Sequence, residues 1–279
     1  SIPECITSIG DKTFLGCRDL ASVELPESVT EIGTEAFTGC ASLRDIVVPS
    51  GVSVIKKKTY SDCTALTSIS IPEGITTIRA EAFEDCTGIT SVTLPESLTT
   101  IEEAPFSGCN NLVEFYGKYA SEDGKYLFDG DTLLAVAPAG LTELTLPEGI
   151  TTIGEYAVGG CKQLLSITIP EGVASIGNGA FSKCEELTEI SIPTSVTYIG
   201  AEAFQLCFKL TDITIPDGVT TIEPKTFFNC NSLKRVSIPD SVTTISDNAF
   251  SVCPSLTDIT IPESVTKIGQ GAFGGCKWL

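Results

Sequence analysis

A cysteine returns every 23 residues along most of this chain, and a proline keeps the same interval. Both series skip once by 52 residues, so one unit has 29 residues where the others have 23. A fixed period in the twenties is typical of coils stacked into a solenoid. The sequence therefore predicts one elongated domain, with any function on its surface rather than in a pocket. The column cysteines are Cys17, Cys40, Cys63, Cys86, Cys109, Cys161, Cys184, Cys207, Cys230, Cys253 and Cys276.

Each coil is predicted to contain two extended segments and one tight turn. In residues 63–86, the segment 69–71 alternates between apolar and polar side chains, as a half-buried strand does. Pro72 ends this strand because proline cannot donate to a ladder, and residues 75–78 form a second, shorter extended segment. The spacing in residues 82–86 fits a helical or 3-10 turn that buries its phenylalanine. We therefore expect a mostly β repeat with short helical turns, in the α/β class.

The column cysteines are expected to be buried free thiols. Stacked coils bring them about 4.8 Å apart with their side chains pointing the same way, which is poor geometry for a disulfide. An odd number of column members also cannot pair completely. Cys5 lies in a turn column that otherwise holds Gly and Ser. It is either an ordinary small residue or the partner of a segment outside this sequence.

The 29-residue unit is predicted to contain a β-hairpin at about residues 116–138. The pair Asp129-Gly130 stands between two apolar triplets, which is a strong signal for a two-residue hairpin loop. One interpretation is an exposed docking loop that carries Tyr116, Tyr119 and Tyr126. The other is a hairpin that covers an edge of the core or relieves accumulated twist, and we favour this second interpretation.

Composition excludes several kinds of site. The chain has 36 acidic and 17 basic residues, a net charge of −19 and no histidine. Nucleic acid is not an expected partner, because phosphate binding depends on Lys and Arg, whereas a basic protein partner is favoured. Imidazole catalysis, zinc knuckles and redox motifs are not expected without histidine or C-x-x-C pairs. No apolar stretch is long enough to cross a bilayer. We expect a non-enzymatic protein without cofactor or metal ion.

Coil stacking gathers the outward strand positions into rows. Glu189 and Asp212 are expected about one strand spacing apart, which is close to the carboxylate separation of retaining glycosidases. Any acidic solenoid produces such neighbours, and Arg235 would neutralise them, so we favour binding over catalysis. The predicted ligand-binding residues of this face are Glu114, Tyr116, Glu143, Glu189, Asp212, Arg235 and Asp258.

A second acidic row follows the column prolines. One interpretation is a set of solvated turn residues, and the other is weak binding of divalent cations along the edge. The row contains Glu4, Glu27, Glu73, Glu96, Glu148, Glu171, Asp217, Asp240 and Glu263.

The repeat resembles the BspA-like leucine-rich repeat family. Residues 187–207, LTEISIPTSVTYIGAEAFQLC, show its pattern, and residues 119–128 are similar to its recurring Y-x-S-x-D-G-x-L-F segment. The glycine column of the pattern is kept at Gly33, Gly154, Gly177, Gly200 and Gly269, whereas other residues stand there in five coils: Lys56, Arg79, Glu102, Glu223 and Ser246.

This resemblance implies a right-handed leucine-rich-repeat solenoid with a parallel sheet on its concave side. With the period, it gives a single domain over residues 1-279 of about 11–12 coils. The resemblance also implies an extracellular or cell-surface adhesin segment that presents the concave face to a protein ligand. The alternative is a structural or scaffolding subunit of a larger assembly. Both ends stop within a repeat, so we expect this sequence to be part of a longer protein.

Overall fold

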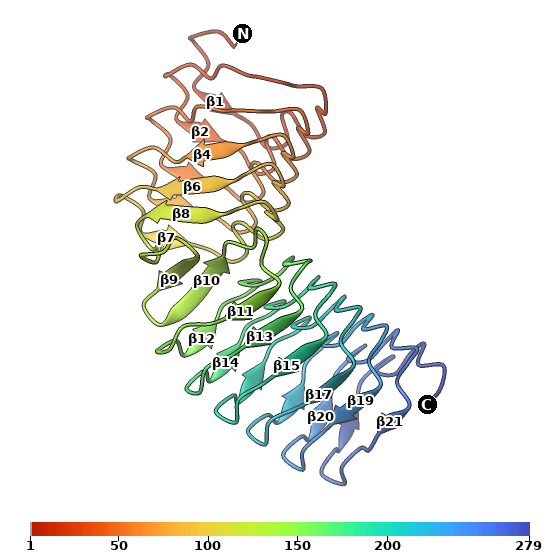
Figure 1. Ribbon diagram of the computed structural model, residues 1–279. Helices are drawn as coiled ribbons and strands as arrows, with labels where there is room; N and C mark the ends of the chain where they lie inside the picture. Colours follow the sequence, from red (N-terminus) through yellow and green to blue (C-terminus); the bar gives the residue numbers. More distant parts are fainter. Residues whose placement is uncertain (1) are drawn as a thin grey trace. The chain divides into compact units, whose positions relative to one another are not determined.

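The computed structural model describes residues 2–279, whose contacts group into two compact units. Unit 1 runs to Asp129 and includes Leu134–Ala139, and unit 2 comprises Gly130–Leu133 and Gly140–Leu279. Each unit is a stack of coils joined by parallel strands, as Figure 1 shows. The predicted parallel solenoid is therefore confirmed for each unit. A single domain over residues 1-279 stays a prediction.

Unit 1 carries strands on two sides of its coils. On the first side lie β4 (Ser68–Ser70), β6 (Ser91–Leu94) and β8 (Glu114–Gly117), which pair in that order. On the second side, β1 (Ser8–Ile9) pairs with β2 (Glu31–Ile32). A separate sheet on this side holds β3 (Val54–Ile55), β5 (Thr77–Ile78) and β7 (Thr100–Ile101).

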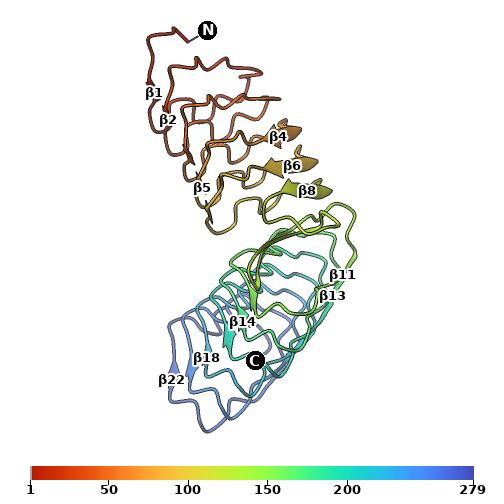
Figure 2. The ribbon, with the colours of Figure 1, turned by 90° about the vertical axis from the view of Figure 1, so that its left-hand side faces the viewer.

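Unit 2 repeats the arrangement with two sheets on each side. We call the side that corresponds to β4, β6 and β8 of unit 1 the first-sheet face. Figure 2 shows three strands of the opposite, second side: β14, β18 and β22. The first-sheet face has β11 (Glu143–Thr145), β13 (Ser166–Thr168) and β15 (Glu189–Ser191), then β17 (Asp212–Thr214), β19 (Arg235–Ser237) and β21 (Asp258–Ile259). The second side has β12 (Thr152–Ile153), β14 (Ser175–Ile176) and β16 (Tyr198–Ile199), then β18 (Thr221–Ile222), β20 (Thr244–Ile245) and β22 (Lys267–Ile268).

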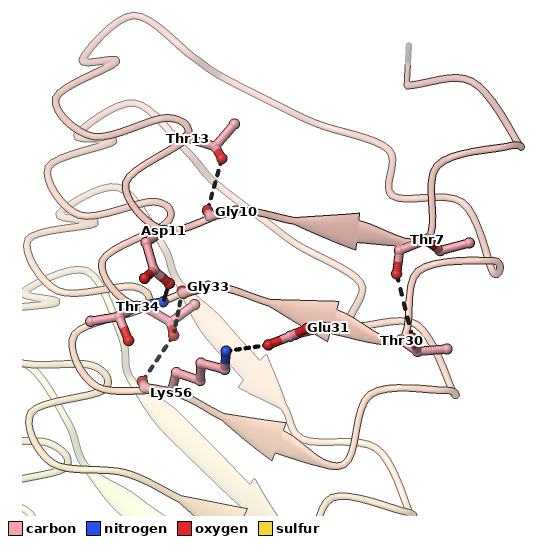
Figure 3. A network of polar contacts seen from close by, with 10 residues as sticks. Thr7, Gly10, Asp11, Thr13, Thr30, Glu31, Gly33, Thr34 and Lys56 are labelled. Atoms are coloured by element: carbon pink, nitrogen blue, oxygen red, sulfur yellow. Dashed lines mark hydrogen bonds and ion pairs between the residues drawn. The ribbon is translucent and has the colours of Figure 1, made fainter.

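The strand register follows the period of the sequence. Ser166 pairs with Glu189 in the first sheet, and Thr221 pairs with Thr244 on the second side, so each partner lies one repeat further along the chain. Because the register equals the repeat, equivalent residues of neighbouring coils form rows. Side chains extend these rows, as Figure 3 shows where Thr30 Oγ1 donates to Thr7 O and Thr34 N donates to Asp11 Oδ1.

The predicted helical or 3-10 turns are wrong, because residues 2–279 contain no helix. The amides of the turn alternate between two destinations. Phe37 N donates to Thr59 O of the next coil at 2.9 Å, whereas Cys40 N donates to Phe37 O at 3.1 Å. A helix would direct every one of these amides within its own segment. Left-handed residues such as Glu35 and Glu81, with φ of 56° and 58°, redirect alternate amides toward the neighbouring coil.

Buried phenylalanine rings and thiols form the centre of each unit. In unit 2, the rings of Phe181, Phe204 and Phe227 stack with centroids 5.3 and 5.4 Å apart. Cys207 Sγ lies 3.2 Å from Phe181 O and donates to it. The cysteine column therefore has a second role besides filling space, because it satisfies the carbonyl of the previous coil's aromatic residue.

The thiols are free, as predicted from the column, but not all of them are buried. Cys5 and Cys17 are exposed and Cys276 is partly exposed, whereas the other column members are buried. Burial raises the pKa of Cys63 to about 12 and that of Cys184 to about 12. Buried thiols with raised pKa values carry little of the thiolate that reacts with alkylating reagents.

We therefore expect iodoacetamide to label the folded protein mainly at Cys5, Cys17 and Cys276, because Cys276 is partly exposed and its hydrogen bond with Cys253 lowers its pKa to about 7. The nine buried thiols should react only after unfolding in urea, and mass spectrometry of digested peptides measures each site. The triple variant Cys5→Ser/Cys17→Ser/Cys276→Ser provides the control, because it should remove the fast reaction of the accessible thiols and leave the slow reaction of the buried ones. Equal labelling of Cys63 and Cys5 in the native protein would contradict the buried column.

The predicted hairpin is present as β9 (Tyr126–Asp129) and β10 (Thr132–Val136), with a Gly130-Asp131 loop. The loop lies one residue later than the sequence signal suggested. In unit 1, Leu127 is fully buried and belongs to the hydrophobic core. This burial supports the interpretation in which the hairpin covers the core.

Candidate ligand-binding face

The structure brings three of the predicted residues together on the first-sheet face of unit 2. Asp212, Arg235 and Asp258 stand opposite one another on β17, β19 and β21. Arg235 Nε donates to Asp212 Oδ1 at 2.8 Å, and both side chains remain largely exposed. The three residues line an open depression of about 520 Å³ that also contains Asp240. A guanidinium between two carboxylates therefore forms a charged row open to solvent.

The ion pair adjusts the charges of this row. The hydrogen bond from Arg235 lowers the pKa of Asp212 below its ordinary value, with a smaller contribution from Thr211. The same bond raises the pKa of Arg235. Because the pKa of the carboxyl is lowered in the folded state, the ion pair stabilises the fold at pH values above the ordinary pKa of aspartate. This stabilisation is lost as the pH falls through the lowered pKa of Asp212. Because both groups are exposed, the contribution to stability is small.

Glu143 and Glu189 lie on the same face, on β11 and β15. Ser166 of β13 separates them and pairs with both strands. Glu189 and Asp212 line one shallow depression of about 470 Å³. However, no strand pairing joins β15 to β17 within residues 2–279, so the predicted strand spacing between these carboxylates is not imposed by a ladder. The structure places them near one surface hollow rather than in a paired geometry.

Hydroxyl groups fill the outward row beside the charges. They are exposed and alternate along the strands with buried or half-buried Leu, Ile and Val side chains, so the face between the charged residues is polar. This row in unit 2 contains Thr145, Thr168, Ser191, Thr214, Ser237 and Thr260.

Glu114 and Tyr116 lie in unit 1, both on β8. A hydrogen bond to Glu114 raises the pKa of Tyr116, whose side chain is 47% exposed. The two residues line a depression of about 210 Å³ closed by the loop at Gly124. Phe115 N donates to Gly124 O at 2.7 Å, which holds this loop against the strand. Gly124 has a φ of 70°, a left-handed conformation that glycine adopts without strain.

The BspA type leucine rich repeat region matches the chain in six copies, over residues 1–113, 137–254 and 197–279. The chain belongs to this family. It is similar to a leucine-rich repeat protein from Eubacterium ventriosum, with 29% identity, a TM-score of 0.77 and coverage of 96% of this chain and 80% of that one. A leucine rich cell surface protein from Faecalibacterium prausnitzii has 27% identity and a TM-score of 0.65, covering 91% and 82% of the two chains.

A third solved structure, a leucine-rich repeat protein from Bacteroides ovatus, has 28% identity and a TM-score of 0.51. It covers 97% of this chain and 80% of that one. No curated protein matches the chain. Membership of the BspA-type leucine-rich repeats supports a protein-interaction module, and the relatives name no ligand.

In this BspA-type solenoid, the acidic row after the prolines has a structural use. Glu27 Oε2 accepts hydrogen bonds from the amide and hydroxyl of Ser50, one coil further on. Glu73 accepts the amides of Glu96 and Ser97, and these bonds lower the pKa of Glu73. Within residues 2–279, no three His, Cys, Asp or Glu side chains gather in a way that could hold a metal ion.

Sequence reasoning missed a row of ion pairs along the turn edge of the BspA-type coils. Lys58 contacts Glu81 at 2.6 Å, and Lys225 contacts Glu202 at 3.0 Å. The signal was present, because opposite charges stand one repeat apart in the turn segment. Asp240, in the depression with Arg235, was noticed only as a turn residue. In the part of the chain that the structure describes, no helix is long and apolar enough to span a bilayer.

Proposed function

We propose that this chain is a non-enzymatic recognition segment of a cell-surface adhesin. It binds a basic protein segment on the first-sheet face of unit 2. The observation that carries the proposal is the exposed charged row on β11, β15, β17, β19 and β21, in which four carboxylates accompany a single arginine. The four carboxylates belong to Glu143, Glu189, Asp212 and Asp258.

Charge complementarity selects the partner. The row contributes four negative charges and one positive charge to the chain's net charge of −19. A lysine- or arginine-rich segment lying across the strands meets carboxylates at intervals, with small hydroxyl side chains between them. Such complementarity raises the association rate and suppresses acidic competitors more than it raises affinity. Arg235 pairs with Asp212 and leaves Asp258 open to the partner.

Glu114 and Tyr116 of unit 1 are proposed as a separate contact for a basic side chain. An exposed tyrosine ring attracts a guanidinium or ammonium group through its π face. The neighbouring Glu114 carboxylate adds a charge-assisted hydrogen bond. The surface location of the whole protein rests on the family and on the relative described as a cell surface protein.

The test uses an octalysine peptide and measures its Kd by isothermal titration calorimetry at 150 mM salt. The triple variant Glu189→Lys/Asp212→Lys/Asp258→Lys should weaken binding at least about 10-fold, because attraction becomes repulsion at the contact. A matched control carries the same charge change on the turn row as Glu148→Lys/Glu171→Lys/Asp217→Lys. It should weaken binding by less than about 3-fold, because these three residues follow the strands and lie outside the proposed row, and salt weakens the remaining long-range repulsion.

Equal losses in the two triple variants would overturn the proposed face, because they would indicate attraction to net charge alone. No binding of octalysine to the wild-type protein would also overturn it. A scaffolding protein would give this second result and would instead remain in a stable complex with its assembly partners.

A further inference from the structure

The coil-to-coil hydrogen-bond ladder of unit 2 is interrupted at one junction. On the first-sheet face, β15 and β17 belong to different sheets, and on the second side β16 and β18 do so too. The two breaks fall between the same pair of coils, residues 188–200 and 211–223. Because strand pairing stops on both sides of the same two coils, its cause lies in how these coils meet and not in one strand.

The amides around this junction show the same interruption. In one row of the second side, Thr197 N donates to Ala174 O and Thr243 N donates to Thr220 O, each at 2.9 Å. Within residues 2–279, no such bond joins the intervening Thr220 N to Thr197 O. In the glycine column, the coils before and after this junction each have an amide hydrogen bond to their preceding coil. Within residues 2–279, Glu223 N makes no such bond.

The glycine column explains where the ladder breaks. Gly177 and Gly200 lie so close to the preceding coil that an added Cβ on Gly200 would stand 2.7 Å from the carbonyl carbon of Gly177. Glu223 is the first residue of unit 2 that places a real Cβ above such a glycine. Because its side chain would meet backbone that cannot move aside, the coil of Glu223 does not form the ladder with the coil of Gly200.

On the second side the same pattern occurs in unit 1, although on the first side Arg44 N still donates to Ala21 O at 3.3 Å across that junction. Lys56 follows Gly33 in the column, and there β2 and β3 belong to different sheets. On the second side, the ladder is intact where one substituted coil follows another. Arg79 N donates to Ile55 O and Ser246 N donates to Ile222 O, each at 2.9 Å. On the second side, the break therefore depends on a side chain that follows a glycine, not on a side chain by itself.

The turn edge still joins the two coils of unit 2. Phe204 N donates to Thr226 O at 2.9 Å, and the rings of Phe204 and Phe227 stack at 5.4 Å. Lys225 pairs with Glu202 at 3.0 Å. On the other side of the coil, Ile199 and Ile222 line an apolar void too narrow for water. The junction is therefore bonded along one edge and loosely packed along the strands.

We propose that this junction is a flexible joint within unit 2, hinged along the turn edge and free to open along both strand faces. Local opening follows the distribution of hydrogen bonds and packing, so motion concentrates where both are deficient. Glu189 and Asp212 lie on opposite sides of the joint, and their separation varies as it opens. The joint goes beyond the proposed function and does not depend on it.

Amide hydrogen exchange tests where the joint lies. In the wild-type protein, the amides of Thr211, Thr220 and Glu223 should exchange on the order of 10-fold faster than those of Lys234, Thr243 and Ser246. The variant Glu223→Gly should move the fast exchange one coil onward, to Lys234, Thr243 and Ser246, because Ser246 then follows a glycine.

Two further variants sharpen the test. Glu223→Gly/Ser246→Gly should slow both sets of amides, because every coil at this place then carries glycine. Ser246→Gly alone is the matched control and should leave the wild-type pattern unchanged. An unchanged pattern in Glu223→Gly, or equal exchange of both sets in the wild-type protein, would overturn the proposal.

A distance measurement tests whether the junction moves. Spin labels on ketone-bearing residues introduced at 191 and 237 span the joint, and labels at 214 and 260 span the same number of coils beyond it. The distance distribution across the joint should be about twofold broader than the control. It should narrow to the control width in Glu223→Gly/Ser246→Gly. Equal widths in the wild-type protein would show a rigid junction and overturn the joint.

Discussion

Replacing Phe204 by alanine is expected to lower the free energy of unfolding of unit 2 by about 3–5 kcal/mol. The ring is fully buried and stacks between Phe181 and Phe227, with centroids at 5.3 and 5.4 Å. Alanine would remove contacts with both neighbouring coils and leave a cavity in a row of stacked rings that cannot collapse around it. Urea denaturation followed by circular dichroism measures the loss.

Phe273→Ala is the matched control, because within residues 2–279 Phe273 stacks only on Phe250, and it is partly exposed. Its loss should be about half that of Phe204→Ala or less, since both buried area and cavity are smaller. Hydrogen exchange should also show faster opening of the coils on each side of Phe204, because neighbouring coils stabilise one another. Equal losses in the two variants would contradict the importance of two-sided stacking.

The rows of this fold could be predicted from the sequence because the strand register equals the repeat. Once residues 23 apart stand opposite each other, the 23-residue spacing alone places Asp212 beside Arg235 and Arg235 beside Asp258. The same argument placed the buried phenylalanine column and the free thiols. Periodicity is the most reliable signal in the chain because it recurs in every unit except the 29-residue one.

The turns could not be predicted in the same way. The spacing of alanine, phenylalanine and cysteine is the same for a 3-10 turn and for the observed turn, in which alternate amides leave for the next coil. Left-handed backbone is usually signalled by glycine. Here Lys12, Glu35, Lys58 and Glu81 occupy such positions, with φ between 54° and 59°. Ion pairs such as Lys58 with Glu81 support these residues. No pattern of neighbouring residues predicted their left-handed backbone.

The geometry between Glu189 and Asp212 also lay beyond the pattern. Both residues occupy the predicted row, but their strands belong to different sheets. The outcome depends on Gly200 and Glu223, which lie on another side of the coil. The substitution at Glu223 is visible in the sequence, but its effect depends on how close the glycine backbones approach. The distance between the glycine backbones of neighbouring coils is known only from the three-dimensional structure.

Replacing Tyr60 by phenylalanine is expected to raise the free energy of unfolding of unit 1 by about 1–3 kcal/mol. Tyr60 stands in the phenylalanine column, fully buried between Phe37 and Phe83 at 5.6 and 5.4 Å. Its hydroxyl has no hydrogen-bond partner within residues 2–279. A buried hydroxyl without a partner loses its bonds to water on folding, and this burial raises the pKa of Tyr60.

Phenylalanine keeps the ring and its stacking but removes the group that loses hydration, so stability should increase. Tyr198→Phe is the matched control, because Tyr198 is 43% exposed and its hydroxyl reaches water in both states. Its effect should lie within about 0.5 kcal/mol of zero. Thermal and urea unfolding measure the change in the free energy of unfolding for each variant. A loss of stability in Tyr60→Phe would mean that the hydroxyl is bonded in solution, for example to a buried water molecule.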